Sequence, residues 1–154
     1  MKFLRFTPDS SVVLPSTTGR KMLETNEPLF LTREMVDEIH EAAISEYGGL
    51  RGVPNEHLLE LESAVNQPRH THHLGGGDLF DAAAAYAFHI VADHPYWDGN
   101  KRTGIGSALI FLRMNSIDTT CLPELATYEC LIKVADHKMD RKELAAFLRQ
   151  RLES

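Results

Sequence analysis

Apolar residues recur at helical spacing along most of the chain beyond residue 30. In the first such stretch Met35 and Ile39 fall on one face, and Thr32 precedes them at the position of an N-cap. Gly48 follows the stretch and can adopt the left-handed conformation in which helices commonly end. The pattern therefore predicts a first α-helix from about residue 32 to residue 47.

Five further stretches have the same kind of periodicity. Pro54 and Asn55 open one of them, and Pro123 opens another at a first helical turn. Asp140, with Glu143 three residues later, resembles a capping box at the start of the last. The predicted helices span about residues 54–65, 78–93, 100–115, 123–137 and 140 onward. We therefore expect an all-α domain, a compact bundle of about six helices.

Two segments do not fit the helical pattern. Residues 1–28 are rich in Pro, Ser and Thr, with one short β-like run at residues 11–14, and form an N-terminal extension of unknown role. Residues 66–78 read "NQPRHTHHLGGGD" and are expected to be a long polar connection. A small β element could occur in either segment. Because the N-terminal extension ends at residue 28, residues 29–154 form one predicted domain.

Composition and charge limit the possible functions. A chain of 154 residues that is 43% hydrophobic and 25% charged suits one soluble domain. Its net charge of −6 excludes a general attraction to nucleic acid or to an anionic membrane. We find no signal peptide and no membrane span, and expect a cytoplasmic protein. Cys121 and Cys130 match no metal-ligand spacing and are expected to be buried, reduced thiols.

The stretch "DHPYWDGNKRTG", residues 93–104, has an unusual charge pattern. A helix N-terminus carries partial positive charge, yet Lys101 and Arg102 stand at the start of a predicted helix. Asp98 or Asn100 could cap that helix, but neither would remove the repulsion between the two cations and the helix end. A bound anion would remove it, and Gly99 would let the backbone approach such an anion closely. The pattern favours a phosphate site.

The same stretch carries groups suited to phosphoryl or nucleotidyl transfer. A neutral imidazole at His94 could act as general base for a hydroxyl nucleophile, and Asp98 is a suitable oxygen ligand for Mg²⁺. Tyr96 and Trp97 are expected to anchor the turn by aromatic burial. A purely structural turn, in which Asp98 is only an N-cap, explains the composition and spacing equally well.

The segment "HPYWDGNKRTG" closely resembles the signature of the Fic/Doc superfamily, His-Pro-Phe-x-x-Gly-Asn-x-Arg. The lysine before the arginine resembles the Doc, or death-on-curing, branch. Residues 29–52 and 78–117 are similar to the opening helix and the central helix-loop-helix of the family, so the resemblance covers roughly residues 29–150. Tyr96 stands in place of the usual phenylalanine, which is a mild change.

The resemblance implies a role for each residue of the motif. His94 would accept the proton of the target hydroxyl, and Asp98 would hold Mg²⁺ as the metal of a Mg-ATP co-substrate. The residues implied to bind the nucleotide phosphates are Gly99, Asn100, Lys101 and Arg102.

Lys101 is where the branches of the superfamily differ. Most Fic enzymes have glycine there and transfer AMP to a protein hydroxyl, whereas a lysine favours a reversed nucleotide that presents its γ-phosphate. The position of a second Fic arginine is occupied here by Ile105. The resemblance implies a toxin that phosphorylates a threonine of elongation factor Tu and is inhibited by a partner antitoxin. AMP transfer and a non-catalytic binding module of the same fold are the alternatives.

The histidines outside the motif have weaker signals. His70, His72 and His73 lack a regular ligand spacing, so a solvated cluster is favoured over a zinc site. In the family this region forms a flap that docks the target, which implies a substrate-docking role for Arg69, His72 and His73. His40 lies on a predicted helix and is expected to have a structural role.

Overall fold

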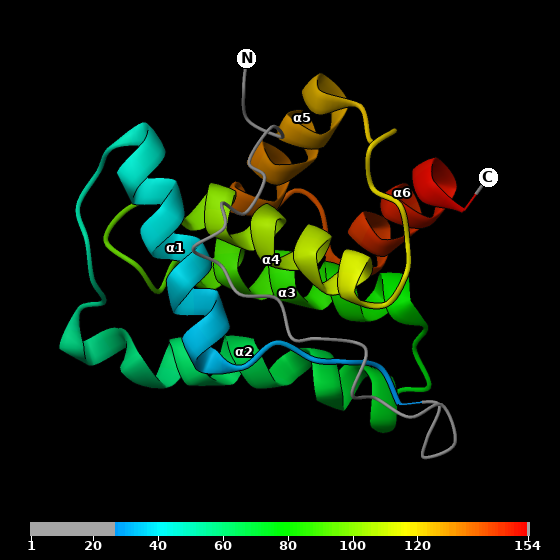
Figure 1. Cartoon of the computed structure of the whole chain (residues 1–154), viewed down its shortest axis with the longest axis horizontal. Helices are drawn as coiled ribbons and strands as arrows, with labels where there is room; N and C mark the ends of the chain where they lie inside the picture. The colour runs from blue at the N-terminus through cyan, green and yellow to red at the C-terminus, as the bar shows by residue number, and fades with distance from the viewer. Residues whose placement is uncertain (1–26, 154) are drawn as a thin grey trace.

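Six α-helices and one short 3₁₀ turn form the part of the chain that the computed structural model describes, residues 27–153 (Figure 1). The elements are α1 (Arg33–Tyr47), η1 (Asn55–His57), α2 (Leu58–His73), α3 (Leu79–Asp93), α4 (Asn100–Met114), α5 (Glu124–Ala135) and α6 (Arg141–Leu152). The prediction of an all-α fold of about six helices is confirmed, and residues 27–153 contain no strand. The β-like run at residues 11–14 lies outside the described residues.

The central helix of the bundle is α3, which packs against α2, α4 and α6. Its alanines at positions 82–85 and 87 are fully buried, and their small side chains let neighbouring helices approach closely. The approach of α4 requires Gly104, because a Cβ there would lie 2.8 Å from Val91 Cγ2 and 3.1 Å from the carbonyl oxygen of Ala87. The α3–α4 pair fixes both ends of the loop that joins these helices.

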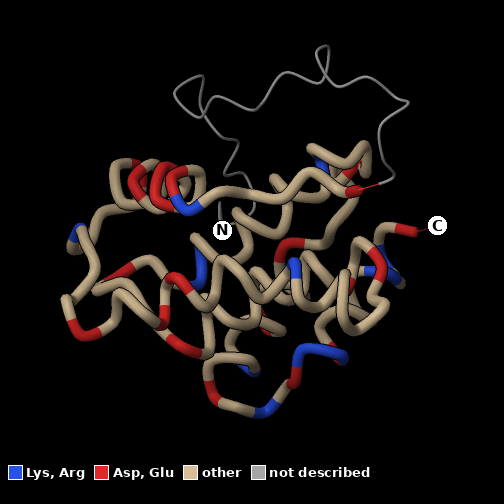
Figure 2. The backbone as a smooth tube through the Cα atoms, turned by 90° about the horizontal axis from the view of Figure 1, so that it is seen from below, with Lys and Arg blue, Asp and Glu red and all other residues tan. Residues whose placement is uncertain are grey.

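Helix α1 crosses the bundle and begins where the sequence predicted. The Thr32 side chain accepts a hydrogen bond from the backbone N–H of Met35, and Gly48 ends the helix with φ +84°. The segment before α1 is fixed to the core, since the N–H of Leu31 donates to the Tyr86 hydroxyl (2.8 Å). Several acidic residues lie along α1, where the tube of Figure 2 is red at successive turns.

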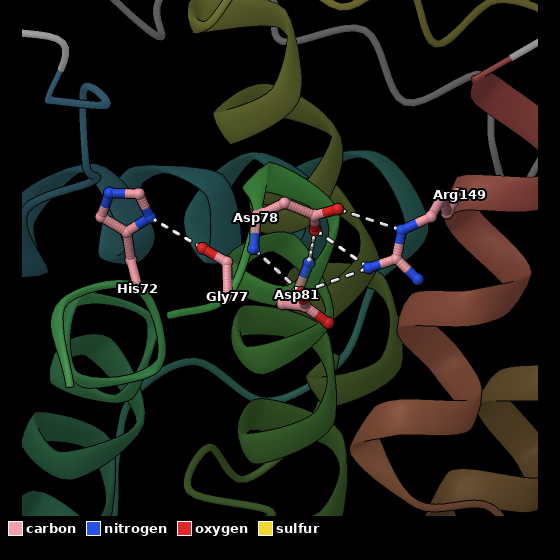
Figure 3. A network of polar contacts seen from close by, with 5 residues as sticks. All are labelled: His72, Gly77, Asp78, Asp81 and Arg149. Carbon is pink, nitrogen blue, oxygen red and sulfur yellow. Dashed lines mark hydrogen bonds and ion pairs between the residues drawn. The ribbon is translucent and has the colours of Figure 1, made fainter. Parts of the chain in front are cut away.

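The N-terminal end of α3 is held by a polar network (Figure 3). Asp78 and Asp81 form a reciprocal capping box, and Arg149 of α6 binds both Asp78 carboxylate oxygens at 3.0 Å. Burial alone would raise the pKa of Asp78, but the hydrogen bonds from Arg149 and from the N–H of Asp81 outweigh it and lower the pKa to about 2. Asp78 is therefore a tether between α3 and α6.

The predicted polar connection at residues 66–78 is wrong. Helix α2 continues to His73, with Pro68 inside it, and only residues 74–78 connect it to α3. Proline disfavours a helix interior because it lacks an N–H, which is why the sequence indicated a break. Here Leu61, Val65 and Pro68 are all buried on one face of α2, so packing overrides the local preference.

Two smaller expectations concern the cysteines and membrane-spanning helices. Cys130 is buried as expected, whereas Cys121 is exposed, and both are free thiols. No helix within residues 27–153 is both long enough and apolar enough to cross a membrane.

Candidate active site

The loop between α3 and α4 begins at a strained residue. His94 is the C-cap of α3, with φ 55° and ψ 52° in the left-handed region. That region costs a non-glycine residue about 1 kcal/mol or more, and the following Pro95 restricts His94 further. Strain of this kind is typical of functional sites. The imidazole of His94 is consequently exposed at the turn rather than packed along α3.

A cleft of about 270 Å³ opens at this loop. It is lined by His94, Asp98, Gly99, Asn100, Lys101, Arg102 and Tyr128. The structure therefore brings together the six motif residues that the sequence singled out. Tyr128 comes from α5 and was missed, because no sequence pattern relates a residue on the fifth helix to a loop 30 positions earlier.

The N-terminus of α4 carries no side-chain cap, although Asp98 or Asn100 was expected to provide one. Gly99 is the N-cap, with φ +79°, and no side chain accepts a hydrogen bond from the first turn. Lys101 and Arg102 lie half-buried in that turn. The partial positive charge of the helix and two cations thus face the same cleft, which is the arrangement that an anion would stabilise.

Asn100 holds the loop together from inside. Its Nδ2 donates to the carbonyl oxygen of Tyr96 and its Oδ1 accepts from the N–H of Tyr96, both at 2.9 Å. The Asn100 side chain is only 3% exposed. The structure therefore gives this side chain a role within the loop that the sequence did not indicate.

Asp98 is fixed by the segment that follows α1. The N–H of Leu50 donates to Asp98 Oδ2 at 2.7 Å, and the N–H of Trp97 donates to the Gly52 carbonyl oxygen at 3.2 Å. Asp98 is an oriented, half-buried carboxylate beside the two cations of the cleft, and Mg²⁺ that binds together with phosphates uses one or two such carboxylates. The residues present therefore fit a magnesium ion.

Helix α1 supports the loop from the other side. His40 is 3% exposed, and its ring stacks on Tyr96 with centroids 3.8 Å apart and planes 8° apart. Its Nε2 lies 2.7 Å from the Asp98 carbonyl oxygen, and the Tyr96 hydroxyl donates to Asp37 Oδ1 at 2.8 Å. Burial lowers the pKa of His40, and the hydrogen bond to Asp98 opposes part of that effect. The expected structural role of His40 is confirmed: its side chain supports the loop through Tyr96 and Asp98.

The two aromatic residues of the loop differ in burial. Tyr96 is 2% exposed, as the sequence predicted, and burial followed by the charge of Asp37 raises its pKa. Trp97 is 53% exposed, so its expected burial is wrong. The aromatic side chain that anchors the turn is therefore Tyr96, through its stack with His40 and its hydrogen bond to Asp37.

Arg69, His72 and His73 lie at the other end of α3 from the loop. They occupy the last turns of α2, which precede the start of α3, whereas the loop follows its end. With 15 residues in α3, the separation is about 20 Å. Arg69 lies over the Phe30 ring at 4.8 Å, and His72 pairs with the Gly77 carbonyl oxygen (Figure 3). None of the three lines the cleft at the loop, and their expected substrate-docking role stays a prediction.

The side chains of the histidine cluster make separate contacts. Among the described residues, no three histidine, cysteine or carboxylate side chains are grouped so that they could hold a metal ion. His73 Nε2 instead lies 2.8 Å from Glu27 Oε1.

Comparison with known proteins decides the family. The sequence model of the Fic/DOC family matches residues 30–112. The chain belongs to the Fic/DOC family. It is 36% identical over 96 residues to "Protein kinase doc" of Escherichia phage P1, an alignment that covers 62% of this chain and 75% of that protein. This similarity confirms the resemblance to the Doc branch. The Fic/DOC match contains α1 through most of α4 and the whole loop, whereas Tyr128 lies beyond it.

Proposed function

We propose that the chain is a Doc-like protein kinase toxin that transfers the γ-phosphate of ATP to a protein hydroxyl. The observation that carries the proposal is the cleft in which His94, Lys101 and Arg102 meet the uncapped N-terminus of α4. A base, two cations and free backbone N–H groups are the parts that phosphoryl transfer needs. The similarity to a relative named as a protein kinase supports the same reaction.

The chemistry follows from the positions of these groups. The His94 imidazole takes the proton of the target hydroxyl while the hydroxyl oxygen bonds to the γ-phosphorus. The bond from the γ-phosphorus to its bridging oxygen breaks, and ADP leaves. Lys101, Arg102 and the first N–H groups of α4 bind the phosphate oxygens throughout. Asp98 would hold Mg²⁺, which neutralises phosphate charge when bound.

Two positions support γ-phosphate transfer over the alternative, transfer of AMP. Lys101 lines the cleft at the position where AMP-transferring members have glycine, and a long cation there occupies space beside the inner phosphates. Ile105 stands where those members have a second arginine, and it is 2% exposed within the core. The second alternative, a non-catalytic module, would not need His94, Asp98 and Arg102 in one cleft.

The proposed target is a threonine of elongation factor Tu, whose phosphorylation would block translation in the cytoplasm. The sequence contains no Ser/Thr-x-x-x-Glu-Gly/Asn segment of the kind that inhibits self-regulated members. We therefore propose that inhibition comes from a separate antitoxin protein.

The proposal is tested by incubating the chain with purified elongation factor Tu and Mg-ATP and locating the modification by mass spectrometry. We expect one phosphothreonine, which His94→Ala and removal of Mg²⁺ with a chelator both abolish. If elongation factor Tu stays unmodified and another protein in a bacterial lysate is phosphorylated, the proposed kinase activity stands and the proposed target is wrong. Absence of transfer to any protein would overturn the proposed function.

A further inference from the structure

His40 lies 54 positions before His94 and outside the loop motif, yet it contacts the loop at two places. Its ring covers the Tyr96 ring, and its Nε2 reaches the Asp98 carbonyl oxygen at 2.7 Å. A carbonyl oxygen only accepts hydrogen bonds, so Nε2 carries the proton and donates it. That bond pins one peptide group, the one between Asp98 and Gly99, to helix α1.

The orientation of this peptide group matters for the cleft. In a trans peptide the C=O and N–H of one unit point in opposite directions. With the Asp98 oxygen held toward His40, the Gly99 N–H points away from α1. The residues that line the cleft come from the loop, α4 and α5, and none comes from α1. Gly99 is itself one of the lining residues, and its N–H faces away from the helix that holds the peptide.

The loop is packed too tightly against α1 to adopt another orientation freely. A Cβ on Gly99 would lie 3.2 Å from Ile44 Cδ1 and 3.6 Å from His40 Nε2. A Cβ on Gly49 would lie 3.1 Å from Asp98 Cβ. Close contact limits the movement of the loop, and the His40 hydrogen bond is made directly to the 98–99 peptide group.

We propose that His40 is a positioning residue for the reaction, which turns the Gly99 N–H toward the nucleotide phosphates and holds Asp98 in register with Leu50. This inference rests on the proposed function. It assigns His40 no contact with substrate and no proton transfer. Its effect passes through one donated hydrogen bond, and a residue that only filled space would not need a donor at Nε2.

Two substitutions separate the donor from the volume. His40→Gln can place an amide nitrogen near the position of Nε2, whereas His40→Leu fills similar space and donates nothing. We expect His40→Leu to lower kcat for γ-phosphate transfer by roughly 10- to 100-fold, the size of effect found when a group that orients a ligand is removed. We expect His40→Gln to retain kcat within about threefold of the unsubstituted chain, well short of that loss.

Two further readouts do not depend on turnover. In the ¹⁵N spectrum of the protein, the Gly99 amide signal should shift in His40→Leu and stay near its original position in His40→Gln. The affinity for Mg-ADP, measured by calorimetry, should fall in the leucine variant and recover in the glutamine variant. Leu144→Ala, a fully buried change on α6, controls for lost stability: it should lower Tm and leave kcat and Mg-ADP affinity unchanged at temperatures well below Tm.

Equal activity in the leucine and glutamine variants, whether high or low, would overturn the proposal, because donation would then make no difference. A loss of kcat in Leu144→Ala as large as that in His40→Leu would also overturn it. If the unsubstituted chain binds Mg-ADP but transfers no phosphate, the proposed function fails, and the Gly99 signal and Mg-ADP affinity still decide the role of His40. A chain that neither transfers phosphate nor binds Mg-ADP overturns both.

Discussion

The guanidinium carbon of Arg102 lies 4.0 Å from the centroid of the Tyr47 ring, so the last turn of α1 holds a cation from the first turn of α4. The ring face is an attractive surface for the cation and leaves the edge of the guanidinium able to bind an anion. Arg102 Nε is buried with no hydrogen-bond partner, which is consistent with a side chain held by stacking. Burial raises the pKa of Tyr47.

Replacing Tyr47 tests whether this stacking prepares Arg102 for a phosphate. Tyr47→Leu should raise KM for ATP by about fivefold, which corresponds to a cation–π contribution of about 1 kcal/mol. Tyr47→Phe keeps the ring face and should keep KM within a factor of two (about 0.4 kcal/mol). Steady-state kinetics with varied ATP provide the measurement. An equal KM in both variants would show that the ring does not position Arg102.

Asn100 should act on stability as well as on activity. Asn100→Ala leaves the buried N–H and C=O of Tyr96 without partners, so the free energy of unfolding should fall by about 2–4 kcal/mol. Lys101→Ala, one residue later, removes a cation from a helix N-terminus and should change the free energy of unfolding by less than about 0.5 kcal/mol. Urea denaturation of both variants checks this. A similar effect of the two substitutions would contradict the role of Asn100 within the loop.

Gly104 and Ser107 make a matched pair on the buried side of α4. Gly104→Ala places a methyl group against Val91 and the Ala87 carbonyl, so the free energy of unfolding should fall by about 1–3 kcal/mol despite the better helix propensity of alanine. Ser107→Ala removes a buried hydroxyl that has no hydrogen-bond partner, and should be neutral or stabilising. Thermal denaturation would refute the close α3–α4 approach if Gly104→Ala raised Tm.

The Asp78 network predicts a component of acid sensitivity. The folded pKa of about 2 lies below the ordinary value of 3.8, so ionised Asp78 stabilises the fold above about pH 4. That contribution is lost as the pH falls from about 4 to about 2. In Asp78→Asn the free energy of unfolding should therefore fall less steeply over that range than in the unsubstituted chain. The free energy of unfolding of both proteins is measured by urea denaturation across this pH range. Equal slopes for the two proteins would show that the Asp78–Arg149 ion pair has no effect on stability.

The helices of this fold were predictable because each leaves a local record in the sequence. Thr32 and Asp140 cap as their residue types indicate, each accepting a hydrogen bond from the backbone N–H three residues later. Pro68 misled the prediction because the preference of proline is local, whereas the buried face that carries α2 past it depends on the rest of the bundle. The same misreading placed Arg69, His72 and His73 in a connection rather than on a helix.

The candidate site was only half visible in the sequence. The motif residues are neighbours in the chain, so their meeting in one cleft needed no knowledge of packing. The contacts of His40 and Tyr47 with the loop, and the place of Tyr128, join positions tens of residues apart. They depend on how α1 packs on α4 and how α5 packs on α3. The caps expected from Asp98 and Asn100 failed because Asp98 binds the distant Leu50 N–H and Asn100 binds Tyr96 within the loop.

The central claim is tested most directly by the fate of label from ATP labelled at either the α- or the γ-phosphate, with elongation factor Tu as acceptor. We predict that label from the γ position alone reaches the protein, that His94→Ala abolishes it, and that Lys101→Gly weakens it because the lysine sets the nucleotide orientation. Unchanged transfer by Lys101→Gly would show that Lys101 does not set the nucleotide orientation, while the proposed kinase activity would stand. Transfer of label from the α position by the unsubstituted chain would contradict the account and identify the chain as an AMP transferase.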